Sequence, residues 1–255
     1  MTSRSALLVV VLLLIVAGGA GAWLLFLRGD DVATLALPSI RPSPAATAAG
    51  ADGSGGPSSA GPSLASASAV AVNPASLPGT WTIAADSVVG YRVRERLASL
   101  SADSDAVGRT DRITGTATIS AADTALSVNA ADFSVDMTAI TSDRSMRDNR
   151  LRTDGLQTDA FPTSTFKLTQ PVAVVAEATT GAQVDVTLHG DLTLHGVTKT
   201  VDIPAKAQLN GGLVQIAGSL SFPFSDFAID PPNVGGFVTV EDHGTLEFLI
   251  NLGQT

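Results

Sequence analysis

From residue 79 onward, apolar residues recur at every second position of the chain. Val89, Tyr91 and Val93 form one such row, separated by polar or small residues. Successive side chains of a strand point to opposite faces, so each row predicts a strand with one buried face. Further rows lie at 133–137, 184–188, 201–205, 214–222 and 246–252.

Turn-forming residues separate these rows, as at Asn210-Gly211-Gly212. About eight strands of this kind, each with one buried face and one solvated face, predict an antiparallel β-barrel or a sandwich.

One stretch has a different pattern. Residues 141–155 are expected to form a short helix, with Ser142 or Asp143 as its cap and Gly155 near its end.

The stretch 189–201 gathers polar residues that resemble a reactive site. Its apolar residues share the even parity of the row that begins at Val184, whereas His189, Asp191, Thr193 and His195 have the opposite parity. These four are therefore expected to face outward, with Gly190 as a bulge or kink, and 196–199 to turn into the next strand. The two histidines would lie about 20 Å apart in an extended strand, too far to share a zinc ion.

The N-terminal residues 6–27 carry no charge and are almost entirely apolar. At about 1.5 Å per residue, a helix of this length crosses a hydrocarbon core of roughly 30 Å. The flanking charges favour a cytoplasmic N-terminus, with the rest of the chain outside. The alternative is a cleaved signal peptide ending at Ala20-Gly21-Ala22, although the apolar run continues through Leu27.

Residues 28–78 are dominated by Ala, Ser, Pro and Gly and show no apolar period. Such a segment buries too little surface to offset its ordering entropy, and a disordered linker is expected. The chain is thus divided into a transmembrane anchor (or signal peptide) at 1–27, a linker at 28–78 and a β-domain at 79–255.

Composition narrows the function without defining it. The chain has 255 residues, is 45% hydrophobic and has a formal net charge of −9. An acidic chain offers no clustered cations for a phosphate backbone, which argues against nucleic-acid binding. Cysteine is absent, so disulfides, thiolate nucleophiles and cysteine-based metal sites are excluded.

Four segments now carry a resemblance to a known family. "WTIAADSVVGYRV", "DRSMRDNRLRTDGLQTDAFPTSTFKL", "GDLTLHGVTKTV" and "FPFSDFAIDPP" occur in this order. Over essentially all of 79–255 the chain resembles the YceI-like family. The resemblance implies a lipocalin-like antiparallel β-barrel with one short helical segment. It also implies an elongated apolar cavity that holds a long isoprenoid chain, such as a polyprenyl or quinone-like lipid, in a protein that is often exported.

The chain departs from the family after its first long strand. There the family usually has a short turn containing histidine, whereas residues 92–114 here form a longer polar stretch. This stretch is expected to change the shape of one mouth of the barrel. The N-terminal anchor and linker are also additional to the family's core domain.

Parity and the resemblance together identify the residues expected to line the cavity. No catalytic residue, metal ligand or cofactor is expected, apart from a bound polyisoprenoid or quinone-like lipid. The expected lining residues are Tyr91, Val93, Phe133, Val135, Met137, Phe166, Leu188, Leu192, Leu194, Leu220, Phe222 and Phe248.

Two rival functions remain open from the residues alone. Alternation does not distinguish a hollow barrel from a filled one, which would be a structural or interaction module of the envelope. An enzyme would need a site at the barrel mouth built on His195 or His243, but His195 is more simply an outward residue of its strand and His243 a turn residue. Nucleophile-elbow and phosphate-loop motifs are absent from the sequence.

The arginine-rich segment around Arg147-Asp148 also has two interpretations. It is either a basic lip that attracts an anionic headgroup, or a surface helix held by ion pairs that docks on the barrel end through Arg147 or Asp148. The second is favoured. A homodimer formed through the edge strands of an incompletely closed barrel is left open.

The whole-chain prediction is a single-pass protein of the cell membrane, held by residues 6–27. Its barrel lies on the extracytoplasmic side and binds a long-chain isoprenoid lipid without catalysis.

Overall fold

A computed structural model describes residues 32–39, 73–97, 103–122, 125–231 and 238–255. The strands are β1 (Gly79–Ile83), β2 (Val88–Leu97), β3 (Asp103–Thr110), β4 (Ile113–Ala122), β5 (Ala125–Asp136), β6 (Thr141–Ser142), β7 (Thr163–Leu168), β8 (Val172–Val174), β9 (Val184–Leu194), β10 (Val197–Asn210), β11 (Leu213–Pro223) and β12 (Val238–Gln254). The helical segments are α2 (Ser145–Thr153) and the 3-10 turns η1 (Pro74–Ser76), η2 (Met137–Ala139), η3 (Ala176–Thr180) and η4 (Phe224–Phe227).

The sheet closes on itself. Antiparallel pairing runs through β1, β4, β5, β7, β9, β10, β11 and β12, and β12 pairs back to β1 with Trp81 opposite Gln254. The predicted barrel of about eight antiparallel strands is confirmed. Within the described residues the ring of these eight strands has no open edge, whereas β3 (103–110) pairs on its second side with β6 only at Gly108 and Arg109. The homodimer through edge strands stays a prediction.

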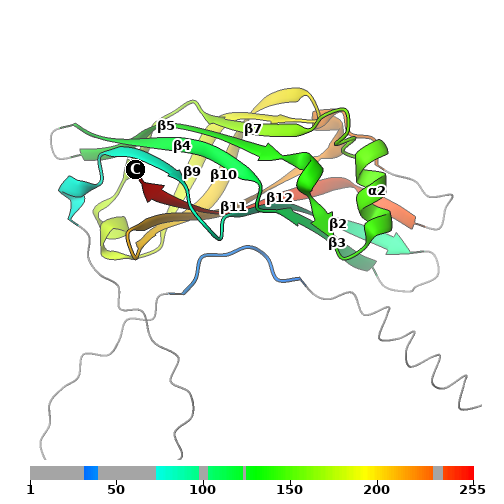
Figure 1. Cartoon of the computed structure of the whole chain (residues 1–255), viewed down its shortest axis with the longest axis horizontal. Helices are drawn as coiled ribbons and strands as arrows, with labels where there is room; N and C mark the ends of the chain where they lie inside the picture. The colour runs from blue at the N-terminus through cyan, green and yellow to red at the C-terminus, as the bar shows by residue number, and fades with distance from the viewer. Residues whose placement is uncertain (1–31, 40–72, 98–102, 123–124, 232–237) are drawn as a thin grey trace, which may run out of the picture.

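Two walls of the barrel are each built from two strands that follow one another along the same line. β2 follows β1 along the same side of β12, pairing with 238–249 while β1 pairs with 252–254. β3 and β4 likewise form one wall beside them. The result is an elongated barrel with α2 at one end (Figure 1).

The stretch 92–114, expected as a polar insert, is mostly regular sheet. β2 and β3 pair from Val89 opposite Thr110 to Arg96 opposite Asp103. Apart from Glu95, their charged residues lie on the outside, and several pair across the strands, as in Arg96–Asp103 at 3.0 Å. The polar composition reflects an outer surface with opposite charges in register, and it lengthens the wall of the barrel.

The alternation of apolar residues correctly predicted the buried face. Phe248, Ile250 and Leu252 of β12 are buried and belong to one core cluster that extends around the barrel. Their partners on β11, such as Ile216 opposite Ile250, have the same inward parity. The core is therefore the inner surface of the closed sheet.

Large aromatic side chains on this inner surface lie across glycines of neighbouring strands. A Cβ atom at Gly108 would lie 2.3 Å from Cε1 of Tyr91, its register partner, and one at Gly218 would lie 2.7 Å from Cζ of Phe248. The same arrangement joins Phe133 to Gly115, Phe166 to Gly190 and Phe224 to Gly244. Because the rings occupy the space of the missing Cβ atoms, they lie against the wall.

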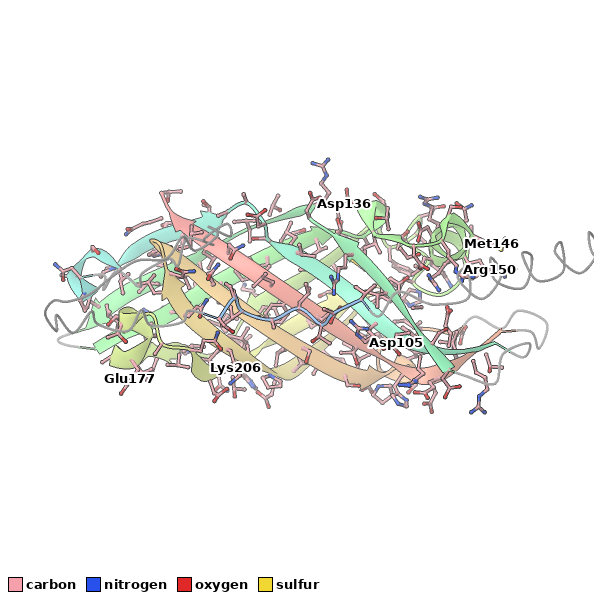
Figure 2. The ribbon with its side chains drawn as sticks, turned by 90° about the horizontal axis from the view of Figure 1, so that it is seen from below. Asp105, Asp136, Met146, Arg150, Glu177 and Lys206 are labelled. Carbon is pink, nitrogen blue, oxygen red and sulfur yellow. The ribbon has the colours of Figure 1, made fainter. Side chains whose placement is uncertain are left out.

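The linker prediction is wrong for two short segments. Residues 73–77 form a turn in which Leu77 is buried and its carbonyl oxygen accepts a 3.0 Å hydrogen bond from Nε1 of Trp81. Residues 32–39 are extended and cross the outside of the barrel, as Figure 2 shows. The outer face under them is therefore covered, whereas alternation predicted a solvated reverse side.

The predicted membrane anchor, residues 6–27, lies outside the described residues. Among the residues that are described, no helix has both the length and the apolar character needed to span a bilayer.

The predicted helix is shorter than expected and is capped differently. α2 begins after Arg144, which makes no side-chain cap. Instead, the carboxylate of Asp148 accepts hydrogen bonds from the backbone N–H and the hydroxyl of Ser142, at 2.9 and 2.7 Å. An acidic side chain in the first turn thus ties the helix to β6.

Replacing Gly108 by Ala tests the packing of rings on glycines. The new Cβ would overlap the ring of Tyr91, so we expect a loss of roughly 1–3 kcal/mol in the free energy of unfolding. Gly253→Ala is the control, because its Cβ would meet only ordinary contacts at 3.7 Å or more. Equal denaturant midpoints for the two variants would contradict this account.

Candidate functional site

The barrel encloses an apolar cavity of about 350 Å³. This volume lies within the range of pockets that hold small molecules, roughly 300–1,000 Å³. Its deep part is lined by inward residues of β9 to β12, including Leu188, Ile203 and Ile250. The alternative of a filled barrel is therefore wrong, and the inner surface leaves room for a guest.

The expected lining residues reach this cavity with one exception. Leu220 does not line it; it packs, half-buried, against the core cluster and lies opposite Leu246 in the register. Parity predicts that a side chain points into the barrel. It does not predict whether other inward side chains separate that residue from the lumen. The residues that do line it are Tyr91, Val93, Phe133, Val135, Met137, Phe166, Leu188, Leu192, Leu194, Phe222 and Phe248.

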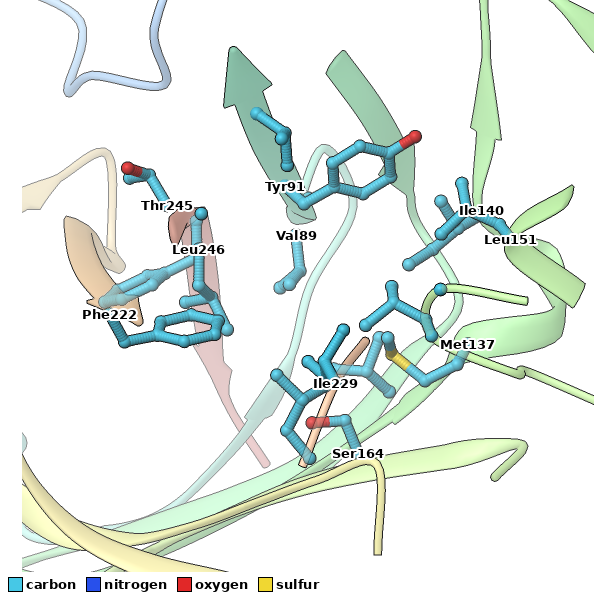
Figure 3. A pocket seen from close by; sticks show the side chains of 18 of the residues that line it. Val89, Tyr91, Met137, Ile140, Leu151, Ser164, Phe222, Ile229, Thr245 and Leu246 are labelled. Atoms are coloured by element: carbon cyan, nitrogen blue, oxygen red, sulfur yellow. The ribbon is translucent and has the colours of Figure 1, made fainter. Parts of the chain in front are cut away.

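The lining residues that were not predicted include strand residues such as Ile203 and Leu246, and others that do not lie on strands. Ile140, Leu151 and Leu156 come from the segment around α2, and Phe224 and Ile229 come from η4 and the loop after it. Alternation cannot identify such positions. Figure 3 shows Met137, Ile140 and Leu151 on one side of the cavity and Phe222 with Leu246 on the other.

A second, smaller cavity of about 100 Å³ lies deeper in the barrel, next to the buried Trp81. Four side chains line both cavities and so form the partition between them: Phe133, Phe166, Leu188 and Ile216. Phe133 and Phe166 are also opposite each other in the register of β5 and β7. Movement of these rings would join the two spaces into one longer channel.

The main cavity opens beside α2. Met146 of this helix lines the cavity and is 77% exposed, so the lumen meets solvent there. Arg144, Arg147 and Arg150 line the same region. The cavity is thus mainly apolar and carries its charged groups at one end, which we call the mouth.

Arg147 docks α2 on the barrel, as one interpretation of its segment predicted. Its guanidinium binds Glu95 of β2 at 3.1 Å and also pairs with Asp143. Burial lowers the pKa of Arg147, but the hydrogen bond and charge of Glu95 outweigh this effect and keep the pKa above its usual value. Arg147 therefore holds the helix, while Arg144 and Arg150 lie at the surface of the mouth, 43% and 47% exposed.

Tyr91 supplies a polar group inside the mouth. Its hydroxyl is buried and has no hydrogen-bond partner among the described residues. Burial raises the pKa of Tyr91 above its ordinary value, so the phenol remains protonated and able to donate. A buried donor of this kind costs free energy until an acceptor reaches it.

The three histidines lie at separate places on the barrel. His189 lies on the outer face, as predicted, and its Nδ1 lies 2.6 Å from a carboxylate oxygen of Asp202. His195 is not on the strand but in the β9–β10 turn with a φ of 52°, and its Nδ1 lies 3.0 Å from the carbonyl oxygen of Phe227. His243 is exposed beside Asp242.

In the part of the chain that the structure describes, no group of three or more acidic or histidine side chains is placed to hold a metal ion.

The turn at His195-Gly196 is tighter than the expected turn through residue 199, since β10 begins at Val197.

These features define a class of protein: a lipocalin-like, closed antiparallel barrel with an apolar lumen and one helix at its mouth. Residues 81–252 match the YceI-like domain family, and the chain belongs to this family. No curated protein matches the chain.

The chain is similar to several solved structures, and the first of them shares its fold. A polyisoprenoid-binding domain from Saccharophagus degradans, implicated in plant cell wall breakdown, aligns with a TM-score of 0.53 and 17% identity over 70% of this chain and 99% of that one. BcnA from Burkholderia cenocepacia aligns with a TM-score of 0.48 and 19% identity, over 66% of this chain and 98% of that one. The YceI protein of Campylobacter jejuni aligns with a TM-score of 0.44 and 15% identity, over 58% of this chain and 84% of that one.

Phe166→Ala tests the partition between the two cavities. Removing the ring should cost roughly 3–5 kcal/mol of stability and open a single longer lumen. A fluorescent probe with a long alkyl chain should then bind more tightly than to the unchanged protein. Phe161→Ala is the control, since Phe161 packs on His195 and lines neither cavity; equal probe affinities for both variants would refute the partition.

Proposed function

We propose that this barrel binds an isoprenoid or a similar amphiphilic lipid, such as a polyprenyl or quinone-like molecule, without catalysis. The observation that carries the proposal is the apolar cavity of about 350 Å³ whose charged lining residues lie at its mouth. An apolar chain fits the interior, and its headgroup fits beside Tyr91 and the arginines of α2. The description of the Saccharophagus degradans domain as polyisoprenoid-binding supports the same ligand class.

The free energy of binding would come from burying the chain. At about 25 cal/mol per Å², each hundred Å² of chain removed from water contributes roughly 2.5 kcal/mol. No directional contact is needed along the lumen, which explains why its lining is almost wholly aliphatic and aromatic. Specificity would come from the mouth, where a few polar groups can orient one end of the ligand.

The same proposal includes a tether. Residues 6–27 would hold the protein in the cell membrane, with the barrel on the extracytoplasmic side. A carrier of membrane-dwelling ligands gains from being held near their source, because attachment raises its effective concentration there.

Lipid extraction from the full-length protein tests the ligand class. The protein purified from its native membrane should release an isoprenoid lipid that mass spectrometry identifies, in about one copy per barrel. A barrel recovered empty that also refuses added polyprenyl lipids and quinones would overturn the proposal.

Tyr91→Phe tests the headgroup contact. An isoprenoid with an oxygen-bearing headgroup should bind roughly fivefold to tenfold more weakly, since one hydrogen bond contributes about 1 kcal/mol net. An isoprenoid hydrocarbon without a headgroup serves as the control and should bind equally to both proteins. If the variant binds both ligands as the unchanged protein does, Tyr91 has no role in recognition. The affinities can be measured by competition with a fluorescent probe.

A further inference from the structure

Residues 32–39, which we call the strap, lie along the outer wall of the barrel. At one end, the guanidinium of Arg92 donates a 2.8 Å hydrogen bond to the carbonyl oxygen of Val32, and Arg109 donates to that of Ala33. Near the middle, the N–H of Leu35 lies 3.5 Å from a carboxylate oxygen of Glu247. The strap is therefore held largely through its backbone.

The other end of the strap contacts amide side chains. The carbonyl oxygen of Pro38 accepts hydrogen bonds from Gln208 and Gln183, at 3.3 and 3.4 Å. Gln208 in turn donates to Gln215 at 2.8 Å, so the contact continues into the wall. Leu37 is the buried side chain of the strap, 8% exposed.

The outer wall under the strap carries charged side chains that are buried or partly buried. Glu247 points outward, yet its side chain is only 3% exposed and lies between Arg92 and Arg109, at 3.4 and 3.1 Å. Two cations face one carboxylate there, and carbonyl oxygens of the strap supply further acceptors. Desolvated charges need such partners, so this cluster indicates a specific docking site.

The direction of the strap places its N-terminal end toward the mouth. Pro38 lies beside Gln183 and Gln208, and Val32 lies beside Arg92 of β2. Three residues further along β2, Glu95 binds Arg147 of the mouth helix. Figure 2 shows the strap along the barrel, with Met146 and Arg150 at one end and Glu177 at the other.

Docking of the strap shortens the tether. Only four residues separate Leu27, where the proposed anchor ends, from Val32. At no more than about 3.6 Å per residue, the step from Leu27 to Val32 spans at most roughly 18 Å. With the strap released, the linker of residues 28–78 would reach on the order of 40 Å as a flexible coil.

The mouth carries a surface suited to a bilayer. Met146 is 77% exposed on α2, and Arg144 and Arg150 are about half exposed beside it. Both arginines pair at the surface with neighbouring aspartates, Arg144 with Asp143 and Arg150 with Asp154, at 3.5 Å each. An exposed apolar side chain beside such arginines can enter the headgroup region of an anionic membrane while lipid phosphates replace the aspartates as partners of the guanidinium groups.

We propose that the docked strap holds the mouth of the barrel against the membrane in which residues 6–27 are anchored. This inference rests on the proposed function, since it requires the anchor and a membrane lipid as ligand. The strap sets both distance and orientation, and α2 is the contact with the surface. An isoprenoid can then pass between bilayer and cavity without crossing water.

The test measures how far each end of the barrel lies from the membrane. The chain has no cysteine, so Met146→Cys and Glu177→Cys each accept one donor fluorophore. The full chain is placed in phosphatidylcholine–phosphatidylglycerol vesicles that contain a headgroup-labelled acceptor. Energy transfer should be at least about twofold more efficient from position 146, because strands at about 3.3 Å per residue keep the ends tens of ångströms apart.

Leu37→Asp releases the strap by placing a charge at its buried position, and the two transfer efficiencies should become equal. Ala36→Asp adds the same charge at an exposed neighbour and should keep the difference. Faster hydrogen exchange at the Leu35 amide verifies release, and an unchanged far-ultraviolet dichroism spectrum verifies the barrel.

Equal energy-transfer efficiency from positions 146 and 177 in the chain with a docked strap would overturn the proposal. So would a difference in efficiency that persists after hydrogen exchange has verified release of the strap. Lipid extraction and vesicle flotation are scored separately. A chain that floats and carries lipid but shows no orientation therefore refutes the strap alone, and one that fails to float refutes the tether as well.

Discussion

The structure depends on how aromatic rings pack on cross-strand glycines inside a closed sheet. Tyr91 lies across Gly108 and Phe248 across Gly218, each in the space that a Cβ would need. A ring that rests on the wall is buried without reaching the middle of the barrel. The sheet can therefore carry large apolar residues, which stabilise it, and still enclose an empty apolar space.

This hollow interior has a polar end because α2 closes over one side of it. The helix has few apolar residues of its own and is held by Arg147 on Glu95 and by Asp148 on Ser142. Of the two interpretations of the arginine-rich segment, docking of a helix held by ion pairs is confirmed, and attraction of an anionic headgroup stays a prediction. Arg147 docks the helix, whereas Arg144 and Arg150 remain at the surface of the mouth.

The outer wall is more specialised than a solvated sheet face. Glu247 and Gln208 point outward yet are buried, because residues 32–39 cross over them. This segment comes from a stretch whose composition predicted disorder, and apart from Leu37 it docks mainly through backbone atoms. Composition therefore gave no signal of the contact, since backbone groups are the same in every sequence.

The sequence by itself determined the strands, their buried faces, the short helix and eleven residues of the cavity lining, because alternation is a local property of the chain. Only the tertiary structure decided that the barrel is hollow, that Leu220 is kept from the lumen and that residues 32–39 are docked. These outcomes depend on contacts between residues far apart in the chain, such as Arg92 with Glu247. Their geometry arises only when the sheet closes.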